Sequence, residues 1–423
     1  MKVAFCTLGC KVNYYETQAM EQLFQSSGYE IVPFETFADI YVINTCTVTQ
    51  TSDQKSRQMI SRAHKQNPTA LIVAAGCYAE TARNSVSQLD GVSLVLGTEG
   101  RRNIVTYCEN ILSGSAAGQE PMPLFSRRAF EELSATRENR TRAVLKIQDG
   151  CKNFCSYCAI PFARGLPRSR SLDSCKKEIS LLASEGFSEI ILTGIELSEF
   201  GIDLPGQPTL ADVVRIAGSV SGIKRIRLGS LDPSFIDSVL IDTLKKCSSF
   251  CPQFHLSLQS GSDIVLSRMR RKYNCDDFRK AVGMIREAFP DSAITTDVIA
   301  GFVGETEEEH AATISFVKEI AFSRMHVFPY SVRNGTAAAS MPGHLPKAVK
   351  ERRAKELISI GHEMEQSYVQ SQIGKVLEVL MEEDGTGYSR NYVRVRCDGR
   401  PGQILNVYIT GCDGTLAIGE PIQ

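Results

Sequence analysis

Three cysteines stand within eight residues, at Cys151, Cys155 and Cys158, with the spacing C-x3-C-x2-C. Thiolates are the usual ligands of iron–sulfur clusters, and they also bind zinc. A structural zinc site takes four protein ligands, whereas no fourth cysteine or histidine follows this triplet closely. Three thiolates on one loop would hold three irons of a 4Fe–4S cluster and leave the fourth iron open to a small molecule. The triplet therefore predicts a catalytic rather than a structural metal site.

Structural zinc is the alternative interpretation of this central triplet. The nearest histidines in the sequence, His64 and His255, stand about 90 residues away. Cys175 could supply a fourth ligand, but its surroundings predict the interior of a helix. A colourless preparation loaded with zinc would favour this interpretation.

A second set of cysteines lies at the ends of predicted strands. Cys10, Cys46 and Cys77 follow the apolar runs KVAFCTLG, YVINT and LIVAAG, each with Gly or Thr directly before the cysteine. The carboxyl ends of parallel strands share one edge of a sheet, where ligands bind, and neighbouring strands are about 4.8 Å apart. Cysteine is also a common buried residue, which is the alternative explanation. We expect these three thiolates to bind a second cluster, again with one open iron.

Repeated strand–helix units must position the second set. The first part of the chain alternates apolar strands with helical segments, which predicts a parallel sheet with helices on its faces. The predicted strands of this N-terminal domain, residues 1–112, are 2–9, 39–45, 70–76 and 93–97. Residues 113–136 are small, polar and proline-containing, and we interpret them as a linker.

A second strand–helix series must position the central triplet, because Cys151 directly follows its first strand. Six strands are predicted, at 143–150, 189–194, 224–230, 254–261, 293–302 and 324–331. A closed eight-fold barrel needs roughly 250 residues, so an open partial (β/α)6 barrel over residues 137–366 fits better. A charged helix is predicted at 346–372, and the short alternating runs that follow predict a small all-β barrel, residues 367–423. The overall class is α/β.

Composition excludes several classes of protein. The 423 residues are 43% hydrophobic and 22% charged, which is typical of a globular chain, and no apolar run reaches the length of about 20 residues that spans a membrane. The N-terminus shows no signal peptide, so we expect a cytoplasmic protein. In a reducing compartment, 14 cysteines favour metal or redox chemistry over disulfides. With a net charge of −1, the chain as a whole does not attract nucleic acid. Any contact with nucleic acid would have to come from local basic clusters.

In this setting the sequence resembles known enzymes. The C-x3-C-x2-C spacing, with Tyr157 before the last cysteine, resembles radical S-adenosylmethionine enzymes over residues 141–331. LGCKVNYYE (8–16), INTCTVT (43–49) and AAGCYAE (74–80) resemble the N-terminal domain of methylthiotransferases, and the tail resembles a TRAM domain, an RNA-binding module. Gly-Cys-Lys-Val-Asn resembles the MtaB-like branch of that family, which acts on N6-threonylcarbamoyladenosine in tRNA. Sibling branches act on isopentenyladenosine in tRNA and on an aspartate of a ribosomal protein.

The resemblance implies a complete reaction. It implies two 4Fe–4S clusters and S-adenosylmethionine, with Cys151, Cys155 and Cys158 catalytic. One S-adenosylmethionine would methylate a sulfur carried at the N-terminal cluster. A second would be cleaved at the central cluster to a 5′-deoxyadenosyl radical, which abstracts hydrogen from C2 of the adenine so that the carbon captures the methylthio group. The implied partners are a tRNA anticodon loop, whose bases can be splayed out, and an electron donor such as flavodoxin or ferredoxin.

Residues at the other strand ends are expected to form the cofactor pocket. They are Gly194, Arg227, Ser230, Gln259 and Asp297. The alternative is that some are only strand-end hydrogen-bonding residues. Methylthiotransferases usually read Gly-Gln-Asn where this chain has Gly194-Ile195-Glu196, so the resemblance assigns Glu196 no role.

Three basic clusters are candidate RNA contacts, because Arg can bind phosphate with two hydrogen bonds. They lie at 164–170, at 268–272, and in the tail at Lys375, Arg390, Arg394, Arg396 and Arg400. Arg394 and Arg396 are expected on one strand face with Tyr392. A solvated face is the alternative for each cluster. For the whole chain, the alternatives are the ribosomal-protein branch and a non-catalytic, metal-containing RNA-binding protein.

Overall fold

The computed structural model describes residues 1–118, 121–135 and 141–422. Its N-terminal domain is a five-stranded parallel sheet in the order β2-β1-β3-β4-β5. The strands are β1 (Lys2–Thr7), β2 (Glu30–Val32), β3 (Ile40–Thr45), β4 (Leu71–Gly76) and β5 (Val92–Gly97). Every residue of β3 and β4 is buried, as a central strand covered on both faces requires. Of these five strands, only the three-residue edge strand β2 was not predicted from the sequence.

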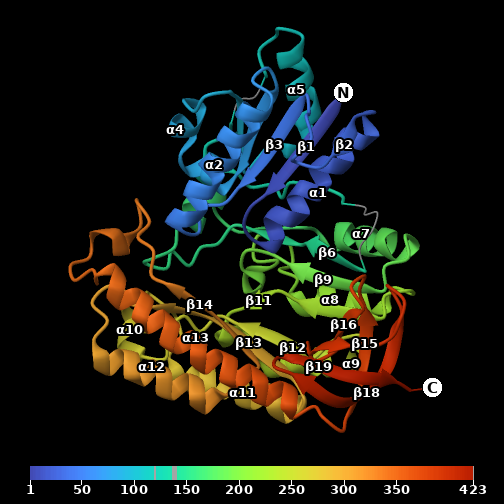
Figure 1. Ribbon diagram of the computed structural model, residues 1–423, viewed down its shortest axis with the longest axis vertical. Helices are drawn as coiled ribbons and strands as arrows, with labels where there is room; N and C mark the ends of the chain where they lie inside the picture. Colours follow the sequence, from blue (N-terminus) through green and yellow to red (C-terminus); the bar gives the residue numbers. More distant parts are fainter. Residues whose placement is uncertain (119–120, 136–140, 423) are drawn as a thin grey trace.

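Helices cover both faces of this sheet (Figure 1). They are α1 (Lys11–Ser26), α2 (Gln50–Gln66), α3 (Cys77–Thr81), α4 (Arg83–Ser87) and α5 (Ile104–Leu112). The start of α2 is fixed by Thr49, whose side chain accepts a hydrogen bond from the Ser52 N–H.

The core contains the six predicted parallel strands in two adjoining sheets. One sheet joins β6 (Arg142–Lys146), β9 (Glu189–Thr193) and β10 (Arg225–Leu228); the other joins β11 (Ser230–Leu231), β12 (Gln253–Leu256), β13 (Ala293–Ala300) and β14 (Arg324–Pro329). The expected strand at 224–230 is divided at Gly229 into β10 and β11. An isolated bridge joins Ile226 of β10 to Phe250, which lies three residues before β12. The open, six-stranded (β/α) core is therefore confirmed.

Most helices of the core lie on its outer side (Figure 1). They are α7 (Leu172–Ser184), α8 (Leu210–Ser219), α9 (Ser238–Lys246), α10 (Asp263–Arg268), α11 (Cys275–Ala288) and α12 (Glu307–Ile320). The short helix α6 (Ile160–Arg164) instead packs against α3 of the N-terminal domain. Capping boxes at Thr209, Asn274 and Thr306 satisfy the first N–H groups of α8, α11 and α12. A short antiparallel pair, β7 (Gln148–Asp149) with β8 (Arg168–Ser169), brackets the central cysteines.

The chain ends in a closed five-stranded barrel, as expected. Its strands are β15 (Val376–Met381), β16 (Thr386–Ser389), β17 (Arg394–Arg396), β18 (Ile404–Asp413) and β19 (Leu416–Pro421). The long helix α13 (Lys347–Gln370) packs along β14 and leads into this barrel, four residues past the expected boundary at 366. In Figure 1 the N-terminal domain lies above the core, and the C-terminal barrel lies at the lower right of the core.

The segment expected to be a linker is docked where the structure describes it, at residues 113–118 and 121–135. Leu133 lies in the core of the central domain, and its carbonyl accepts hydrogen bonds from the hydroxyl of Tyr15 and from Arg170. Arg127 is buried and pairs with Glu80 and Glu99 of the N-terminal domain. This segment therefore holds the two domains together. No helix of the described residues is long and apolar enough to cross a membrane.

Candidate active site

The central cysteines lie on the loop between β7 and α6, and each sulfur meets a hydrogen-bond donor. The N–H groups of Asn153 and Ile160 are 3.4 Å from the sulfurs of Cys151 and Cys158. The guanidinium Nη1 of Arg271 is 3.1 Å from the sulfur of Cys155. Hydrogen-bond donors and a nearby cation favour a thiolate over a thiol. The surroundings of all three sulfurs therefore fit thiolate ligands.

Burial of the same cysteines disfavours their deprotonated form as long as they bind no metal. It raises the pKa of Cys158 to about 12, and with Glu199 as the next cause it raises the pKa of Cys151 further above its ordinary value. A thiol that coordinates a metal is deprotonated outright, because the metal supplies the positive charge. The donor set and the burial together fit cysteines that ionise on binding an iron–sulfur cluster.

The zinc alternative gains no support from the geometry. Within the described residues, no three His, Cys, Asp or Glu side chains are placed to hold a single metal ion. Cys175, the candidate fourth ligand, is buried inside α7 in the hydrophobic core of the central domain. A cluster binds one thiolate per iron, so its three cysteines need not converge on one point.

The N-terminal cysteines meet at the carboxyl edge of the sheet, as the topology predicts. Cys10 follows β1, Cys46 follows β3, and Cys77 follows β4, and these strands are adjacent. Gly9 has a φ of +106°, and a Cβ added there would lie 3.0 Å from the sulfur of Cys46. The backbone next to Cys10 therefore passes directly over Cys46, which requires glycine.

The three thiols differ in their surroundings. Cys46 and Cys77 are buried, whereas Cys10 is exposed. Burial raises the pKa of Cys77 to about 12, and the cation of Arg164 opposes this shift most strongly. The Nε of Arg164 lies 3.3 Å from the sulfur of Cys77. This donor favours a thiolate at Cys77, so the second set also fits a cluster.

The two sets of cysteines are neighbours in space. Helix α3 begins at Cys77, and it packs against α6, which begins two residues after Cys158. Arg164, the last residue of α6, reaches from the central loop to the sulfur of Cys77. The fold therefore brings the two sets together across the domain interface.

A cavity of about 680 Å³ opens beside the N-terminal set. It is lined by residues of all three domains: Cys10 and Lys11 from the sheet edge, Val144 and Ile191 from the core strands, and Tyr392 from the C-terminal barrel, among others. Cys10 is the cysteine that faces it. A cavity of this size accommodates a nucleoside-sized group.

Three of the expected cofactor residues lie on or just after neighbouring strands. Ser230 is exposed on β11. Gln259 adopts a φ of +67°, and its N–H donates to the carbonyl of Asp297 at 2.9 Å. The carboxylate of Asp297 lies 3.4 Å from the Nε2 of His255. Ser230 begins β11, Gln259 follows the end of β12, and Asp297 lies in the middle of β13, so these residues come from three adjacent strands. Their role as cofactor ligands stays a prediction.

The close approach at Gly194 is to a protein side chain. A Cβ added there would lie 2.9 Å from the Oε1 of Gln148. That oxygen accepts hydrogen bonds from the N–H groups of Ile195 and Glu196, both at 2.9 Å. Gln148 was missed in the sequence, because a lone Gln at a strand end carries no signal. Burial, and then Asp232, raises the pKa of Glu196 to about 7.

Arg227 is the third residue of β10, and its side chain reaches the C-terminal barrel. Its Nε donates to Glu189 at 2.9 Å, and its terminal nitrogens donate to the carbonyls of Arg390 and Ser389 at 3.0 and 2.6 Å. These contacts give Arg227 a role in holding the C-terminal barrel against the core. Its expected role towards the cofactor stays a prediction without a supporting contact.

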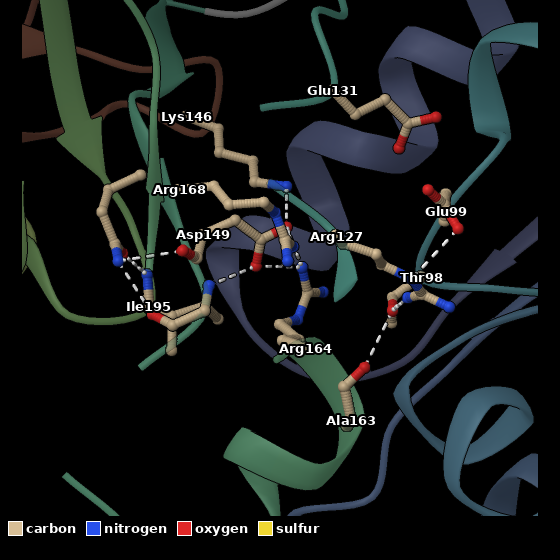
Figure 2. A network of polar contacts seen from close by, with 12 residues as sticks. Thr98, Glu99, Arg127, Glu131, Lys146, Asp149, Ala163, Arg164, Arg168 and Ile195 are labelled. Atoms are coloured by element: carbon tan, nitrogen blue, oxygen red, sulfur yellow. Dashed lines mark hydrogen bonds and ion pairs between the residues drawn. The ribbon is translucent and has the colours of Figure 1, made fainter. Parts of the chain in front are cut away.

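The expected RNA contacts at 164–170 are corrected by the structure. Arg164, Arg168 and Arg170 are buried, because carboxylates distant in sequence neutralise them. Figure 2 shows Arg164 and Arg168 with Asp149 and Lys146 inside the domain interface. The sequence contained no pattern that predicted these carboxylate partners.

In the cluster at 268–272, Arg268 pairs with Glu309 and Arg271 pairs with Asp232, whereas Arg270 is exposed.

The tail retains exposed cations. Arg394 and Arg396 are exposed on β17, on either side of the buried Val395. Tyr392 is not on their strand face as expected: it precedes β17 with a φ of +64° and stacks on Tyr388 at 4.9 Å. Arg400 is exposed, Lys375 pairs with Asp291, and Arg390 donates to carbonyls of the core.

Comparisons with known proteins agree with this geometry. The family model described as "Uncharacterized protein family UPF0004" matches residues 2–97, and the Radical SAM superfamily model matches residues 145–317. The threonylcarbamoyladenosine tRNA methylthiotransferase MtaB of Bacillus subtilis (strain 168) is 42% identical over 96% of this chain and 93% of its own length. The tRNA-2-methylthio-N(6)-dimethylallyladenosine synthase of Mycobacteroides abscessus is 33% identical over 96% of this chain and 85% of its own length.

Among solved structures, the radical S-adenosylmethionine methyltransferase TsrM from Kitasatospora setae, with cobalamin and a [4Fe-4S] cluster bound, has a TM-score of 0.59. It is 16% identical, and the match covers 80% of this chain and 77% of that one. At this identity the likeness concerns the fold alone.

Proposed function

This chain belongs to the radical S-adenosylmethionine methylthiotransferases, and on that premise we propose that it transfers a methylthio group to C2 of N6-threonylcarbamoyladenosine next to the anticodon of tRNA. The observation that carries the proposal is the adjacency of two cysteine sets, bridged by Arg164, beside a cavity that Cys10 faces. An unactivated aromatic C–H bond is not opened by acid–base catalysis at neutral pH. A radical source and a held sulfur must therefore lie close together.

Both cysteine sets are proposed to hold 4Fe–4S clusters: Cys151, Cys155 and Cys158 the central one, and Cys10, Cys46 and Cys77 the N-terminal one. When bound, the clusters and S-adenosylmethionine supply a 5′-deoxyadenosyl radical at the first site and a methylated sulfur at the second. The chain's own part is to orient these groups. Gly194, Ser230, Gln259 and Asp297 are the proposed cofactor residues, and an electron donor such as flavodoxin or ferredoxin is the proposed reductant.

Lys11 supports the choice of nucleoside. The threonyl group of threonylcarbamoyladenosine ends in a carboxylate, whereas a dimethylallyl group is a hydrocarbon. In the cavity, Arg142 pairs with Glu382, and Asp384 pairs with Arg394. Within the described residues, no carboxylate pairs with the exposed Lys11, which directly follows Cys10. We assign its ammonium group to the threonyl carboxylate.

The C-terminal barrel is proposed to bind the tRNA through exposed arginines such as Arg394, Arg396 and Arg400. The proposed domains are a cluster domain at 1–112, a linker at 113–136, a radical core at 137–366 and an RNA-binding domain at 367–423. A tRNA substrate also supports the predicted cytoplasmic location.

Mass spectrometry of tRNA nucleosides tests the function. The gene is expressed in a host that lacks this activity, and its tRNA is compared with that of the same host carrying an empty vector. The expected result is a new methylthio form of threonylcarbamoyladenosine. A methylthio form of isopentenyladenosine instead would place the chain in the sibling branch. An unchanged tRNA profile with iron-loaded protein would favour the ribosomal-protein aspartate, and with iron-free protein a non-catalytic RNA-binding protein.

A further inference from the structure

We propose that Arg164 is a positioning residue shared by both cysteine sets, which fixes the two cluster loops to each other and sets the reduction potential of the N-terminal cluster. The inference rests on the proposed function in one respect, that the N-terminal cysteines hold a cluster. Arg164 is fully buried, and all three of its guanidinium nitrogens have partners. Those partners come from both domains.

Towards the N-terminal domain, Arg164 holds the loops that bear the cysteines. Its Nη2 donates to the Oδ1 of Asn13 at 2.7 Å and to Glu16 at 3.0 Å, both in the first two turns of α1. The amide of Asn13 donates in turn to the carbonyls of Leu8 and Thr45 at 2.7 and 2.9 Å. Thr45 directly precedes Cys46, and Leu8 lies two residues before Cys10. A single side chain thereby fixes two cysteine-bearing strand ends and donates to the third cysteine.

Towards the central domain, Arg164 holds the start of the Cys151 loop. Its Nη1 lies 3.1 and 3.2 Å from the two carboxylate oxygens of Asp149. Asp149 accepts the N–H of Gly150 at 2.8 Å, and the N–H of Cys151 donates to the carbonyl of Gly165 at 3.0 Å. Cys151 itself is therefore hydrogen-bonded to the residue directly after Arg164, and the residue directly before Cys151 is held by Asp149.

The charges around Arg164 favour an anionic partner. Its ion-pair network contains four buried cations, whose carboxylate partners number three; the cations are Arg101, Lys146, Arg164 and Arg168, and the carboxylates are Glu16, Glu131 and Asp149. One positive charge is therefore left over among the described residues. The Nη1 of Arg168 is also buried without a hydrogen-bond partner there. The sulfur of Cys77 lies 3.3 Å from the Nε of Arg164, at this unbalanced positive charge, where an anionic cluster ligand would be placed.

This arrangement has a measurable consequence. Hydrogen bonds to cluster sulfurs help to set a cluster's reduction potential, and a nearby positive charge stabilises the reduced form, which carries one more negative charge. Arg164 supplies both to Cys77. Its removal should lower the potential of the N-terminal cluster, an effect that a merely structural residue would not produce.

The test isolates the N-terminal cluster. The full-length chain carries Cys151→Ala, Cys155→Ala and Cys158→Ala, and reductive titration followed by electron paramagnetic resonance gives the midpoint potential. Arg164→Gln should shift this potential to more negative values. Arg164→Lys keeps the charge but cannot reach Cys77, Glu16 and Asp149 together, so it should give a smaller shift. If Arg164→Gln does not fold, the shift of the midpoint potential in Arg164→Lys is the test.

Arg127→Gln is the matched control, because Arg127 is also buried and pairs with the carboxylates of Glu80 and Glu99. Figure 2 shows Arg127 beside Glu99. Within the described residues, Arg127 makes no hydrogen bond to a cysteine sulfur. The midpoint potential of Arg127→Gln should equal that of the parent. An unchanged potential in both Arg164 variants, or an equal shift in Arg127→Gln, would overturn the inference. An N-terminal site without iron in the parent would overturn the two-cluster proposal as well, so the two failures are distinguishable.

Discussion

The two cysteine sets are proposed to bind the same kind of ligand, but they are built differently. The central set lies within eight residues, and its own loop supplies the N–H donors to two of its sulfurs. The N-terminal cysteines stand 36 and 31 residues apart and meet only because three parallel strands end at one edge. Their charged donor, Arg164, comes from the other domain. The central site is therefore locally encoded, whereas the N-terminal site depends on the docking of two domains.

The largest effect is expected from replacing a cysteine of the central set. Cys155→Ala should abolish the cleavage of S-adenosylmethionine, because one ligand of the proposed radical cluster is lost. The measurement is 5′-deoxyadenosine formation under reducing conditions, with Cys251→Ala, a buried cysteine outside both sets, as control. Undiminished 5′-deoxyadenosine from Cys155→Ala would remove the central site from the mechanism.

Replacing a cysteine of the N-terminal set should affect only the formation of the methylthio product. Cys46→Ala should leave 5′-deoxyadenosine formation intact and block the methylthio product, because we propose that the sulfur is held at the N-terminal set. Both products are quantified by mass spectrometry from one incubation with tRNA. Normal methylthio product from this variant would refute the N-terminal site.

A smaller effect is expected at the donor of the central site. Arg271 donates to Cys155 and pairs with Asp232 at 3.0 Å, so Arg271→Gln removes a buried charge next to the cluster. Groups that orient metal ligands typically contribute 10- to 100-fold in activity or metal affinity, and we expect a loss of about that size in the cleavage rate. The neighbouring exposed Arg270→Gln is the control. Equal rates for the two variants would show that the Arg271 contact has no effect.

Substrate recognition should be affected less. Lys11→Met should lower kcat/KM for tRNA bearing threonylcarbamoyladenosine by about tenfold, the equivalent of one lost charged hydrogen bond of roughly 1.4 kcal/mol. The cleavage of S-adenosylmethionine without tRNA should not change. Lys55→Met, at an exposed lysine on α2 away from the cavity, is the control. A loss in both lysine variants, or in neither, would contradict the assignment of Lys11.

The smallest expected effect concerns acid stability of the shared ion network. Burial alone would raise the pKa of Glu16, but Arg101, Arg164 and Lys146 lower it from 4.5 to about 2. A carboxylate whose pKa is lowered in the folded state stabilises the protein above its ordinary pKa, and this contribution is lost as the pH falls towards the folded value. The difference in unfolding free energy between wild type and Glu16→Gln should therefore be constant above pH 4.5 and shrink below it. Denaturant unfolding of the metal-free chains measures it, and a difference that grows in acid would contradict the network.

The sequence predicted what depends on local pattern. The fully buried strands β3 and β4 were predicted at 39–45 and 70–76, close to their observed bounds, and the strand predicted at 143–150 corresponds to β6 and β7. Because strand ends carry ligands, these elements were enough to place both cysteine sets at sites that fit clusters.

The sequence could not show long-range pairing of charges. Arg164 and Arg168 were expected at the surface, since arginine is rarely buried unless it is paired. Their partner carboxylates include Glu16, which is 148 residues from Arg164, and no local pattern connects the two. The same holds for Arg227, whose partner Glu189 lies on another strand. The residues that join the domains were therefore visible only in the fold.

The central claim, that each cysteine set holds its own cluster, is tested most directly by counting iron. The chain is reconstituted without oxygen, and iron and acid-labile sulfide are measured together with Mössbauer spectra. The wild type should hold about eight iron atoms per chain, and replacing either set of three cysteines by alanine should leave about four, from one remaining 4Fe–4S cluster. A wild type with about four iron atoms, unaffected by loss of Cys10, Cys46 and Cys77, would contradict the account.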